Sequence, residues 1–418
     1  MDTSSAPGPG RQHSLIYFGD QWDDLWRRRQ ALCSKLAERG LFERTLYVEQ
    51  PLSLSSLLRW LRRPPDADAR RRWGRLLRQR RTLLQVHPKI CLWTPVTPLG
   101  LRQSRMMSAL DNLFRVHGQA RTLRRLTSRM GFSLPVVCVS LPLVDRRVLE
   151  SVQPALLWYD CTEDFTKFEH LPARVREACG TMDAWLTDNA DVVTAVSVVQ
   201  FEAKRTRRGS RATLYSPNGL LLEPFLAPVP SDAPEDMAAV PRPRLMFVGA
   251  GLNTSHDWDM VDMLASRRPN LSIALIGQDT LPRPLHERLA THSNIHFLGL
   301  KPYGHLPRYL AHADLCLQIS RPGHLPSQES VLKVWLYLAA GKPVLSLTTT
   351  TGADKGGLIT VAATRDEFIA KVDEAMTSNT PQLQARRKAL AQESSWDARA
   401  DAVYQMLADA LARKNLPD

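Results

Sequence analysis

Short apolar runs alternate with helical stretches along this chain, and the alternation occurs twice. In the first half, apolar runs lie at 14–18, 45–49, 134–140, 155–160 and 191–197, separated by polar segments with helical spacing. Apolar runs of this length that alternate with helices are typical of parallel sheets covered on both faces. The pattern therefore predicts an α/β fold built from doubly wound sheets.

A proline-rich segment separates the two series of strands and helices. Six prolines lie between Pro224 and Pro243, and neither a helix nor a central strand tolerates such a density. Apolar runs return from residue 244 onward, and helical spacing continues to the C-terminus. We expect these parts: an N-terminal domain at 1–223 with an Arg-rich insertion at 57–81, a linker at 224–243, a C-terminal domain at 244–380, and helices at 381–418 that pack back toward the N-terminal domain.

The charge of the chain is unevenly distributed. The net charge is +13, yet residues 1–150 hold 27 Lys and Arg against 12 Asp and Glu, and the remainder holds 28 against 30. Ten arginines fall between Arg59 and Arg81, interleaved with Trp and Leu. Such a segment suits an anionic membrane surface. The alternatives are a solvated basic helix pair and a nucleic-acid contact; the last ranks lowest, because no recognised nucleic-acid module accompanies the charge.

Two further features concern the compartment. No apolar run reaches the ~20 residues that a membrane-spanning helix requires, and the polar N-terminus lacks the order of a secretory signal. The six cysteines are scattered without a CxxC pair, which argues against a zinc site or a disulfide framework. We therefore expect a cytosolic protein with reduced thiols.

The segment QESVLKVWLYLAAGKPV at 328–344 predicts a helix that leads through a turn into a buried strand. A helix start is an anion site, because free backbone N–H groups and the helix dipole converge there. Gln328, Glu329 and Ser330 lie at this start, and Lys333 adds a cation suited to a pyrophosphate. The alternative is that Glu329 and Lys333 form a surface ion pair.

The loop VGAGLNTSHDWD connects a predicted strand to a predicted helix. Gly249 and Gly251 allow the backbone to approach a ligand closely. Thr254 stands where a dinucleotide fingerprint has its third glycine, which disfavours a nicotinamide enzyme. We assign the two glycines to donor binding, with an ordinary strand–helix turn as the alternative.

Carboxylates follow one strand of the first half directly. Asp160, Glu163 and Asp164 lie at the end of the apolar run 155–160, in YDCTEDF. At the carboxyl end of a strand, one of them could deprotonate an acceptor hydroxyl. Alternatively, they cap the next helix. The spacing does not select among the three.

Four other residues of the first half are candidates for the acceptor or phosphate side of the site. Gly19, Trp22 and Arg28 follow the first strand, and Asn218 lies in SPNG ahead of the linker. Arginine suits a phosphate or a lipid-linked acceptor. The alternatives are an amphipathic helix start and an ordinary Asn-Gly turn.

Together and in this order, the motifs resemble those of bacterial GT-B glycosyltransferases of capsule, teichuronic and exopolysaccharide synthesis. The pieces that carry the resemblance cover most of the chain: IYFGDQWDDLWRRRQALCSKLAERG, LYVEQP, LLWYDCTEDF, NADVVTAVS, SPNG, LMFVGAG, HDWDM, NIHFLGLKPYGHLPRYLAHADLCL and VLKVWLYLAAGKPV. The resemblance implies two Rossmann-like domains facing a crevice and a nucleotide-sugar donor, with UDP the expected nucleotide. It also implies a lipid-linked saccharide or growing polysaccharide as acceptor, a peripheral position at the cytoplasmic membrane face, and no bound metal or cofactor.

Two positions on the donor side depart from the family. Retaining members carry two glutamates eight positions apart, the second bonding the donor ribose; the residues here are Gln328 and Leu336. Enzymes similar to xanthan glucuronosyltransferase carry a lysine at the position of Lys333, a glutamine at that of Leu336, and an aspartate base in the first domain. The resemblance implies a hexosyl- or glucuronosyltransferase and leaves the retaining or inverting outcome open. Leu336 favours the alternative, a non-catalytic GT-B relative that serves as a binding or scaffolding subunit of a polysaccharide assembly.

Overall fold

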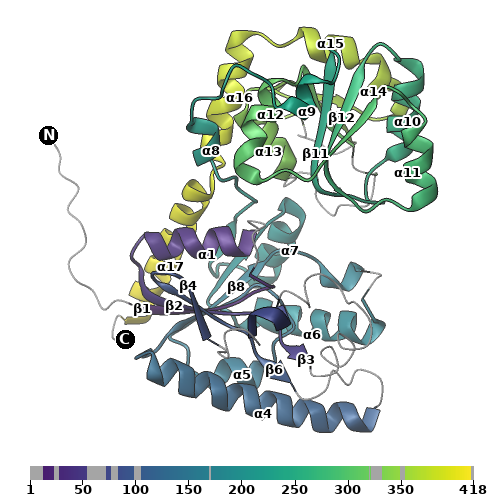
Figure 1. The fold of residues 1–418 in the computed structure, drawn as a ribbon. Helices are drawn as coiled ribbons and strands as arrows, with labels where there is room; N and C mark the ends of the chain where they lie inside the picture. Colours follow the sequence, from purple (N-terminus) through teal and green to yellow (C-terminus); the bar gives the residue numbers. More distant parts are fainter. Residues whose placement is uncertain are drawn as a thin grey trace, which may run out of the picture. The chain divides into compact units, whose positions relative to one another are not determined.

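The chain folds into two compact units, each built on a parallel or mostly parallel sheet with helices on its faces (Figure 1). The computed structural model describes residues 13–22, 28–53, 72–76, 83–97, 105–168, 171–319, 321, 332–348 and 354–415. The first unit comprises Met1–Ser216 and Ala400–Asp418, and the second comprises Pro217–Arg399. The predicted α/β class with two doubly wound sheets is confirmed.

The larger sheet of the first unit has eight strands within the described residues. In sheet order they are β10 (Thr213–Tyr215), β9 (Val192–Ala195), β8 (Leu156–Cys161), β7 (Val136–Val139), β1 (His13–Phe18), β2 (Phe42–Val48), β5 (Ile90–Trp93) and β4 (Leu83–His87). All neighbours are parallel except β4 and β5, which form an antiparallel edge. The short strands β3 (Leu52–Ser53) and β6 (Val96–Thr97) pair separately.

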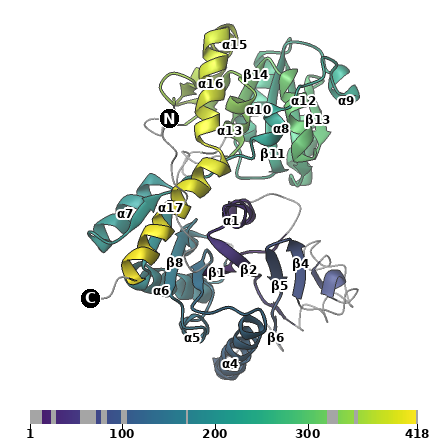
Figure 2. The same ribbon diagram turned by 90° about the vertical axis from the view of Figure 1, so that its left-hand side faces the viewer.

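Helices cover both faces of this sheet. They are α1 (Arg28–Glu38), α4 (Arg105–Arg129), α5 (Arg146–Glu150), α6 (Ala173–Asn189), α7 (Val198–Arg208) and most of α17 (Trp396–Asn415), with a 3₁₀ turn η1 (Phe165–Lys167). α4 packs against α5, and both lie on the face opposite α1 (Figure 1, Figure 2). Buried side chains of α4 and α5, among them Leu123 and Val148, close the core beneath the sheet.

Within its described residues, the second unit has a six-stranded parallel sheet. Its strands, in sheet order, are β13 (Ile295–Gly299), β12 (Ser272–Asp279), β11 (Arg244–Leu252), β14 (Leu315–Gln318), β15 (Val344–Leu347) and β16 (Thr360–Ala362). Its helices are α8 (Glu223–Leu226), α9 (Glu235–Ala238), α10 (Trp258–Arg267), α11 (Arg283–Ala290), η2 (Tyr303–His305), α12 (Leu306–Ala311), α13 (Leu332–Ala339), α14 (Arg365–Ala370), α15 (Val372–Thr377) and α16 (Pro381–Glu393). Apolar clusters fill both faces of the sheet.

The structure places the proline-rich segment 224–243 with the second unit, whose first residue is Pro217 rather than 244. Two apolar side chains explain this, because Met237 and Val240 are buried in the core of that unit. Residues 381–418 are divided: α16 belongs to the second unit and most of α17 to the first. Lys414 near the end of α17 forms an ion pair of 2.8 Å with Asp191.

The described part of the Arg-rich insertion is bound to the first unit rather than presented to solvent. Residues 72–76 are helical, and Trp73 is buried. Arg75 pairs with the buried carboxylate of Glu49, and Arg72 donates to the backbone oxygen of Gln50. The rest of Arg59–Arg81 lies outside the described residues, so its docking on a membrane stays a prediction.

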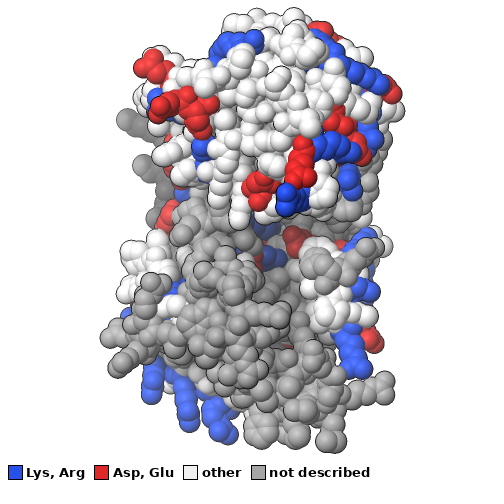
Figure 3. Space-filling view, turned by 45° about the vertical axis from the view of Figure 1, so that its right-hand side comes forward, with Lys and Arg blue, Asp and Glu red and all other residues white. Residues whose placement is uncertain are grey.

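Charge is distributed differently over the two units. Figure 3 shows Lys and Arg beside Asp and Glu on the second unit, and Lys and Arg without acidic neighbours at the lower left edge of the first. Within the part of the chain that the structure describes, no helix combines the length and apolar character needed to cross a membrane.

Candidate functional site

Each sheet has a reversal of strand order beside its first strand, and several of the sequence-predicted site residues lie near these two places. In the first sheet the reversal lies between β1 and β7, since β1 leads to β2 on one side and β7 leads to β8 on the other. Ligands of doubly wound sheets bind at the carboxyl ends of the strands beside such a reversal. Gly19, Asp160 and Arg28 all belong to this edge of the first sheet.

Asp160 is the centre of a buried polar network. Arg28 binds its carboxylate with two nitrogens, Nη2 to Oδ1 at 2.8 Å and Nε to Oδ2 at 3.2 Å. Thr194 donates to Oδ1 at 2.7 Å, and Tyr17 and Ser140 donate to Oδ2 at 3.2 and 3.3 Å. Burial alone would raise the pKa of Asp160, but the pairing with Arg28 and the hydrogen bond from Thr194 hold it below its ordinary value.

This geometry gives Asp160 a supporting role. Its side chain is 0% exposed, and its hydrogen-bond partners come from β1, β9, α1 and the residue that follows β7. A carboxylate that is charged, enclosed and bonded at both oxygens is a poor proton acceptor for a substrate. The pair with Arg28 instead fixes the start of α1 on the edge of the sheet.

A second buried pair, which the sequence did not indicate, lies beside the first. Arg29 donates from Nη1 to Asp20 at 2.9 Å, from Nε to Ser140 Oγ at 2.9 Å, and from Nη2 to Thr162 Oγ1 at 2.6 Å. Tyr47 donates to the other oxygen of Asp20 at 3.2 Å. The run of three arginines at 27–29 was the available signal, but its spacing could not separate buried partners from ligand-binding groups.

Gly19 and Trp22 are held by the same edge of the sheet. A Cβ atom at Gly19 would lie 2.1 Å from the hydroxyl of Tyr47, so this position has no room for a side chain. The backbone N–H of Trp22 donates to the buried carboxylate of Glu49 at 2.8 Å, and its ring meets Tyr47 edge-on. Both residues therefore have a packing role, which does not test their assignment to the acceptor side.

The other two carboxylates of YDCTEDF differ in exposure and in use. Asp164 caps η1: it accepts from the N–H of Thr166 at 3.2 Å and pairs with Lys167 at 3.2 Å. Its partial burial would raise its pKa, but these contacts hold the pKa below its ordinary value. Glu163, by contrast, is exposed at the carboxyl edge of the sheet, and its charge acts on Arg29.

Asn218 belongs to the second unit, where the SPNG turn packs against the segment between α16 and α17. The N–H of Leu220 donates to Ser394 at 3.2 Å, and the N–H of Trp396 donates to Leu220 at 2.9 Å. A Cβ at Gly219 would lie 2.8 Å from the backbone nitrogen of Trp396. The glycine of this motif is thus required by packing, and the role of Asn218 in ligand binding stays a prediction.

The reversal in the second sheet lies between β11 and β14. The two strands pair only at their first residues and then diverge. The buried hydroxyl of Tyr337 on α13 spans the gap, accepting from the N–H of Val248 at 2.9 Å and donating to the C=O of Leu317 at 3.3 Å. The carboxyl ends of β11 and β14 are therefore held apart in the way a ligand site at a strand reversal requires.

Gly249 and Gly251 lie at this end of β11, where the strand bulges between Val248 and Gly251. A Cβ at Gly277 on the neighbouring strand would lie 2.7 Å from the backbone oxygen of Gly249, so the two backbones touch. Neither Gly249 nor Gly251 would bring a Cβ closer than 3.3 Å to another atom. A separation of 3.3 Å at Gly249 is tight packing that favours glycine, whereas the contacts at Gly251 are of ordinary length, and the role of both glycines in ligand binding stays a prediction.

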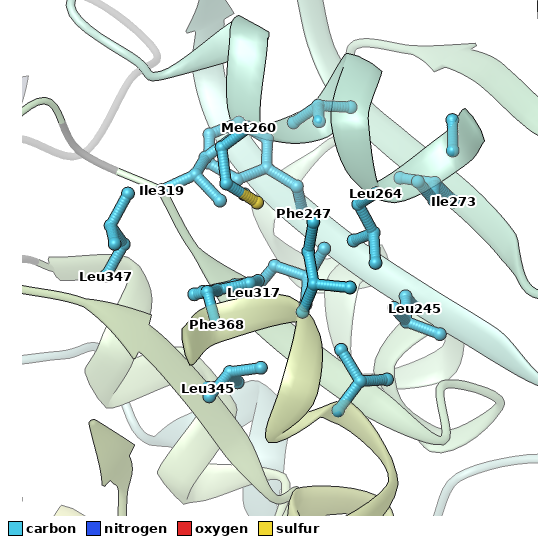
Figure 4. Packing of buried hydrophobic residues seen from close by; sticks show 14 of the residues in the cluster. Leu245, Phe247, Met260, Leu264, Ile273, Leu317, Ile319, Leu345, Leu347 and Phe368 are labelled. Carbon is cyan, nitrogen blue, oxygen red and sulfur yellow. The ribbon is translucent and has the colours of Figure 1, made fainter. Parts of the chain in front are cut away.

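Lys333 joins this loop from α13. Its Nζ lies 4.2 Å from the centre of the Phe247 ring, a cation–π contact, and Phe247 packs with Met260, Leu317 and Ile319 (Figure 4). Burial against this apolar cluster lowers the pKa of Lys333 to about 7. The site thus contains a lysine whose charge would be restored by an anionic ligand.

His256 completes the cluster and was missed from the sequence. Its ring meets Phe247 and Trp258 edge-on, with centroids 4.8 and 5.8 Å away, and it hydrogen-bonds the backbone of Gly251. Burial and the nearby charge of Lys333 lower the pKa of His256 to about 3, so the ring is neutral near pH 7. The HDWD run after the glycines was the available signal.

Comparison with known proteins identifies the architecture. No family model and no curated protein matches the sequence. Solved structures do match over nearly the whole chain: sucrose-phosphate synthase from Thermosynechococcus elongatus has 14% identity and a TM-score of 0.66, covering 96% of this chain and 100% of its own. The chain has the GT-B fold. HepE from Anabaena, in complex with UDP and glucose, has 15% identity and a TM-score of 0.60, covering 95% of this chain and 100% of its own. An E. coli trehalose-6-phosphate structure bound with UDP-2-fluoro glucose has 11% identity and a TM-score of 0.64, covering 97% of this chain and 99% of its own.

Three of the predicted donor-binding residues, Gln328, Glu329 and Ser330, lie outside the described residues. Leu336, at the position where retaining relatives are expected to carry a ribose-binding glutamate, is 5% exposed and packs in the apolar cluster of α13. Among the described residues, no group of three or more His, Cys, Asp or Glu side chains is placed to hold a metal ion. Metal independence nevertheless stays a prediction.

Proposed function

We propose that the protein is a glycosyltransferase that takes a sugar from a nucleotide-sugar donor, with UDP as the nucleotide. The observation that carries this proposal is the position of Lys333 against Phe247, on the strand that ends in Gly249 and Gly251, at the strand reversal of the second sheet of a GT-B fold. Structural neighbours were solved with UDP and glucose or with UDP-2-fluoro glucose, which supports the same class of ligand.

On the donor side, we assign Gly249 and Gly251 at the end of β11 to the approach of the diphosphate, and Lys333 offers the cation. A diphosphate would restore the proton on Lys333, because a nearby anion favours the charged form. His256 stays neutral and fixes the loop through Gly251 and Phe247. We assign it a positioning role.

On the acceptor side, we infer that Glu163 is the group that accepts a proton from, or orients, the acceptor hydroxyl. Of the three carboxylates after β8, Asp160 is buried in an ion pair and Asp164 caps η1. Glu163 alone among the three is exposed at the carboxyl edge. An exposed carboxylate at the carboxyl edge of the sheet is the kind of group that a general base requires.

The finer parts of the proposal are an acceptor that is a lipid-linked saccharide or growing polysaccharide, a hexosyl or glucuronosyl group as the sugar transferred, independence of metal, and a peripheral position at the cytoplasmic membrane face. A panel of nucleotide sugars tests the core of the proposal. We expect thermal stabilisation by at least one UDP-sugar and release of UDP when an acceptor lipid is added. Absence of stabilisation by every nucleotide sugar would contradict it.

A second candidate function is that of a non-catalytic GT-B subunit of a polysaccharide assembly. It is favoured by Leu336, which is buried in the core at the position expected to bind the donor ribose. Leucine offers no acceptor for a ribose hydroxyl. Binding of a UDP-sugar without release of UDP on any lipid-linked acceptor would favour this subunit over the enzyme.

Replacing Lys333 with methionine is expected to weaken UDP-sugar binding by about 10- to 100-fold, since a hydrogen bond to a charged group contributes about 1.5–3 kcal/mol. Titration calorimetry measures the affinity. The matched control is Lys388→Met, which removes the same charge from an exposed position on α16. Full affinity in Lys333→Met would contradict the assignment of Lys333 to the phosphates.

The lowered pKa of Lys333 predicts that removing its charge stabilises the folded chain, whereas the same change weakens donor binding. The ordinary lysine pKa is 10.5 and that of Lys333 is about 7, so in this interval the unfolded chain binds a proton that the folded chain lacks. The contribution of Lys333 to the free energy of unfolding therefore rises with pH from about 7 to about 10.5. The affinity for the donor falls over the same range, because Lys333 loses its charge. Lys333→Met should raise the Tm near pH 7 and remove this component of the pH dependence. A lower Tm near pH 7 would contradict the burial argument.

A further inference from the structure

The exposed face of α4 carries a row of arginines. Arg121, Arg124, Arg125 and Arg129 are all exposed, and the sequence from 116 to 132 contains no Asp or Glu. The four positions are spaced by three and four residues, so they share one side of the helix. At 1.5 Å per residue, the row is about 12 Å long.

The opposite side of α4 is committed to the core. Val116, Ala120, Leu123 and Thr127 are buried, and Val116 and Leu123 belong to the apolar cluster beneath the sheet. This packing fixes the rotation of the helix about its axis. The arginine row is consequently held outward, as part of a rigid surface of the first unit.

The four arginines differ from those of α7, which are also exposed. On α7, Arg205 pairs with Glu202 at 2.7 Å and Arg207 pairs with Asp188 at 2.5 Å. Within the described parts of the chain, no carboxylate forms an ion pair with an arginine of the α4 row. Among the described residues, the exposed arginines of α7 are thus compensated by ion pairs, and those of the α4 row are not.

The helix dipole explains the presence of only one of these four arginines. Basic side chains in the last turn of a helix offset the partial negative charge of its C-terminus. Arg129 ends α4 and is accounted for in this way. Arg121 and Arg124 lie more than one turn from the end, where the effect has fallen off. A ligand with spread negative charge accounts for all four.

An exposed apolar side chain lies just beyond the row. Leu134 follows the end of α4 and is 58% exposed. At the height of α4, Figure 3 shows Lys and Arg side chains at the lower left with no described acidic side chain among them. Basic side chains next to an exposed apolar one suit the boundary between lipid head groups and acyl chains.

We propose that this surface, Arg121, Arg124, Arg125 and Arg129 with Leu134, docks on an anionic phospholipid bilayer. The choice of a bilayer rests in part on the proposed function, whose lipid-linked acceptor would be found there. The surface is distinct from the Arg59–Arg81 region, in which described arginines are bound to Glu49 and Gln50. Attraction is electrostatic, so it weakens as salt rises.

The test is sedimentation of the full chain with vesicles of phosphatidylcholine alone or mixed with phosphatidylglycerol. We expect binding only to the mixed vesicles, and a loss of about 100-fold or more in the variant R121Q/R124Q/R125Q/R129Q. The control R205Q/R207Q/R267Q/R283Q removes four exposed, paired arginines and the same net charge. It should bind nearly as well as the wild type. Leu134→Ser should weaken binding without altering its dependence on salt.

Three outcomes would overturn the proposal: equal binding to both kinds of vesicle, equal loss in the α4 variant and the control, or displacement of the protein from vesicles by equimolar duplex DNA or RNA. The last would assign the surface to nucleic acid. Exposed substitutions should leave the Tm unchanged. UDP-sugar binding measured in the same variants separates this proposal from the proposed function, because the donor residues lie in the other unit.

Discussion

Glu163→Gln is expected to lower the rate of sugar transfer by about 100- to 10,000-fold, the usual contribution of a positioned general base. Glutamine keeps the size of the side chain but cannot accept the proton. Glu163 is exposed, so its substitution should leave the Tm and the affinity for the UDP-sugar nearly unchanged. Release of UDP in the presence of acceptor, followed at saturating donor, measures the rate.

The matched control is Asp164→Asn, one residue away. Asp164 caps η1 and pairs with Lys167, so its loss should cost at most about 1 kcal/mol of stability and little activity. If Asp164→Asn abolished transfer and Glu163→Gln did not, the base would be Asp164. If neither did so, the first unit would supply no base from this loop, which would favour a retaining mechanism or a non-catalytic protein.

These three carboxylates illustrate how far the sequence reaches. The run 155–160 predicts a strand, and the strand β8 places all three residues at one edge of the sheet. Their division into a buried pair, a cap and an exposed group depends on contacts with residues 17, 28, 140 and 194, which no local pattern specifies. Periodicity determines which edge a residue occupies, and tertiary packing determines whether a substrate can reach it.

The fold itself is largely encoded in local pattern. Buried parallel strands are short and apolar throughout, so most of them are evident as runs in the sequence. The segment 217–243 was harder, because prolines mark an interruption while two apolar side chains, Met237 and Val240, anchor it to the second core. Composition indicates that the chain leaves regular structure there, and says little about the surface against which it then packs.

The proposed donor site was predicted in part. The glycines and Lys333 were indicated by their position in a strand–loop–helix pattern, and the structure brings Lys333 to Phe247 on the strand that carries the glycines. The sequence did not indicate His256 and Tyr337, because each hydrogen-bonds a backbone group of β11 and neither belongs to a recognisable motif. Residues that position a backbone segment by tertiary contacts can be identified only once the structure is known.

Asp160→Ala is expected to lower the stability of the first unit by about 3–5 kcal/mol, because it leaves the buried guanidinium of Arg28 without its carboxylate. The lowered pKa of Asp160 gives the same sign: the stability that the charged form contributes is present above the ordinary pKa of 3.8 and is lost as pH falls through the lower, folded value. Urea unfolding followed by Trp fluorescence measures the change, since Trp158 donates to Thr194, which in turn bonds Asp160.

The double variant Arg28→Met with Asp160→Leu separates a structural pair from a catalytic one. Replacing both members of a buried ion pair by apolar side chains of similar volume is often neutral for stability. We therefore expect the double variant to recover most of the stability lost in Asp160→Ala and to retain sugar transfer, because Glu163 is untouched. Recovery of stability without recovery of transfer would return Asp160 or Arg28 to the site itself, since the supporting role derived from their burial requires both to recover together.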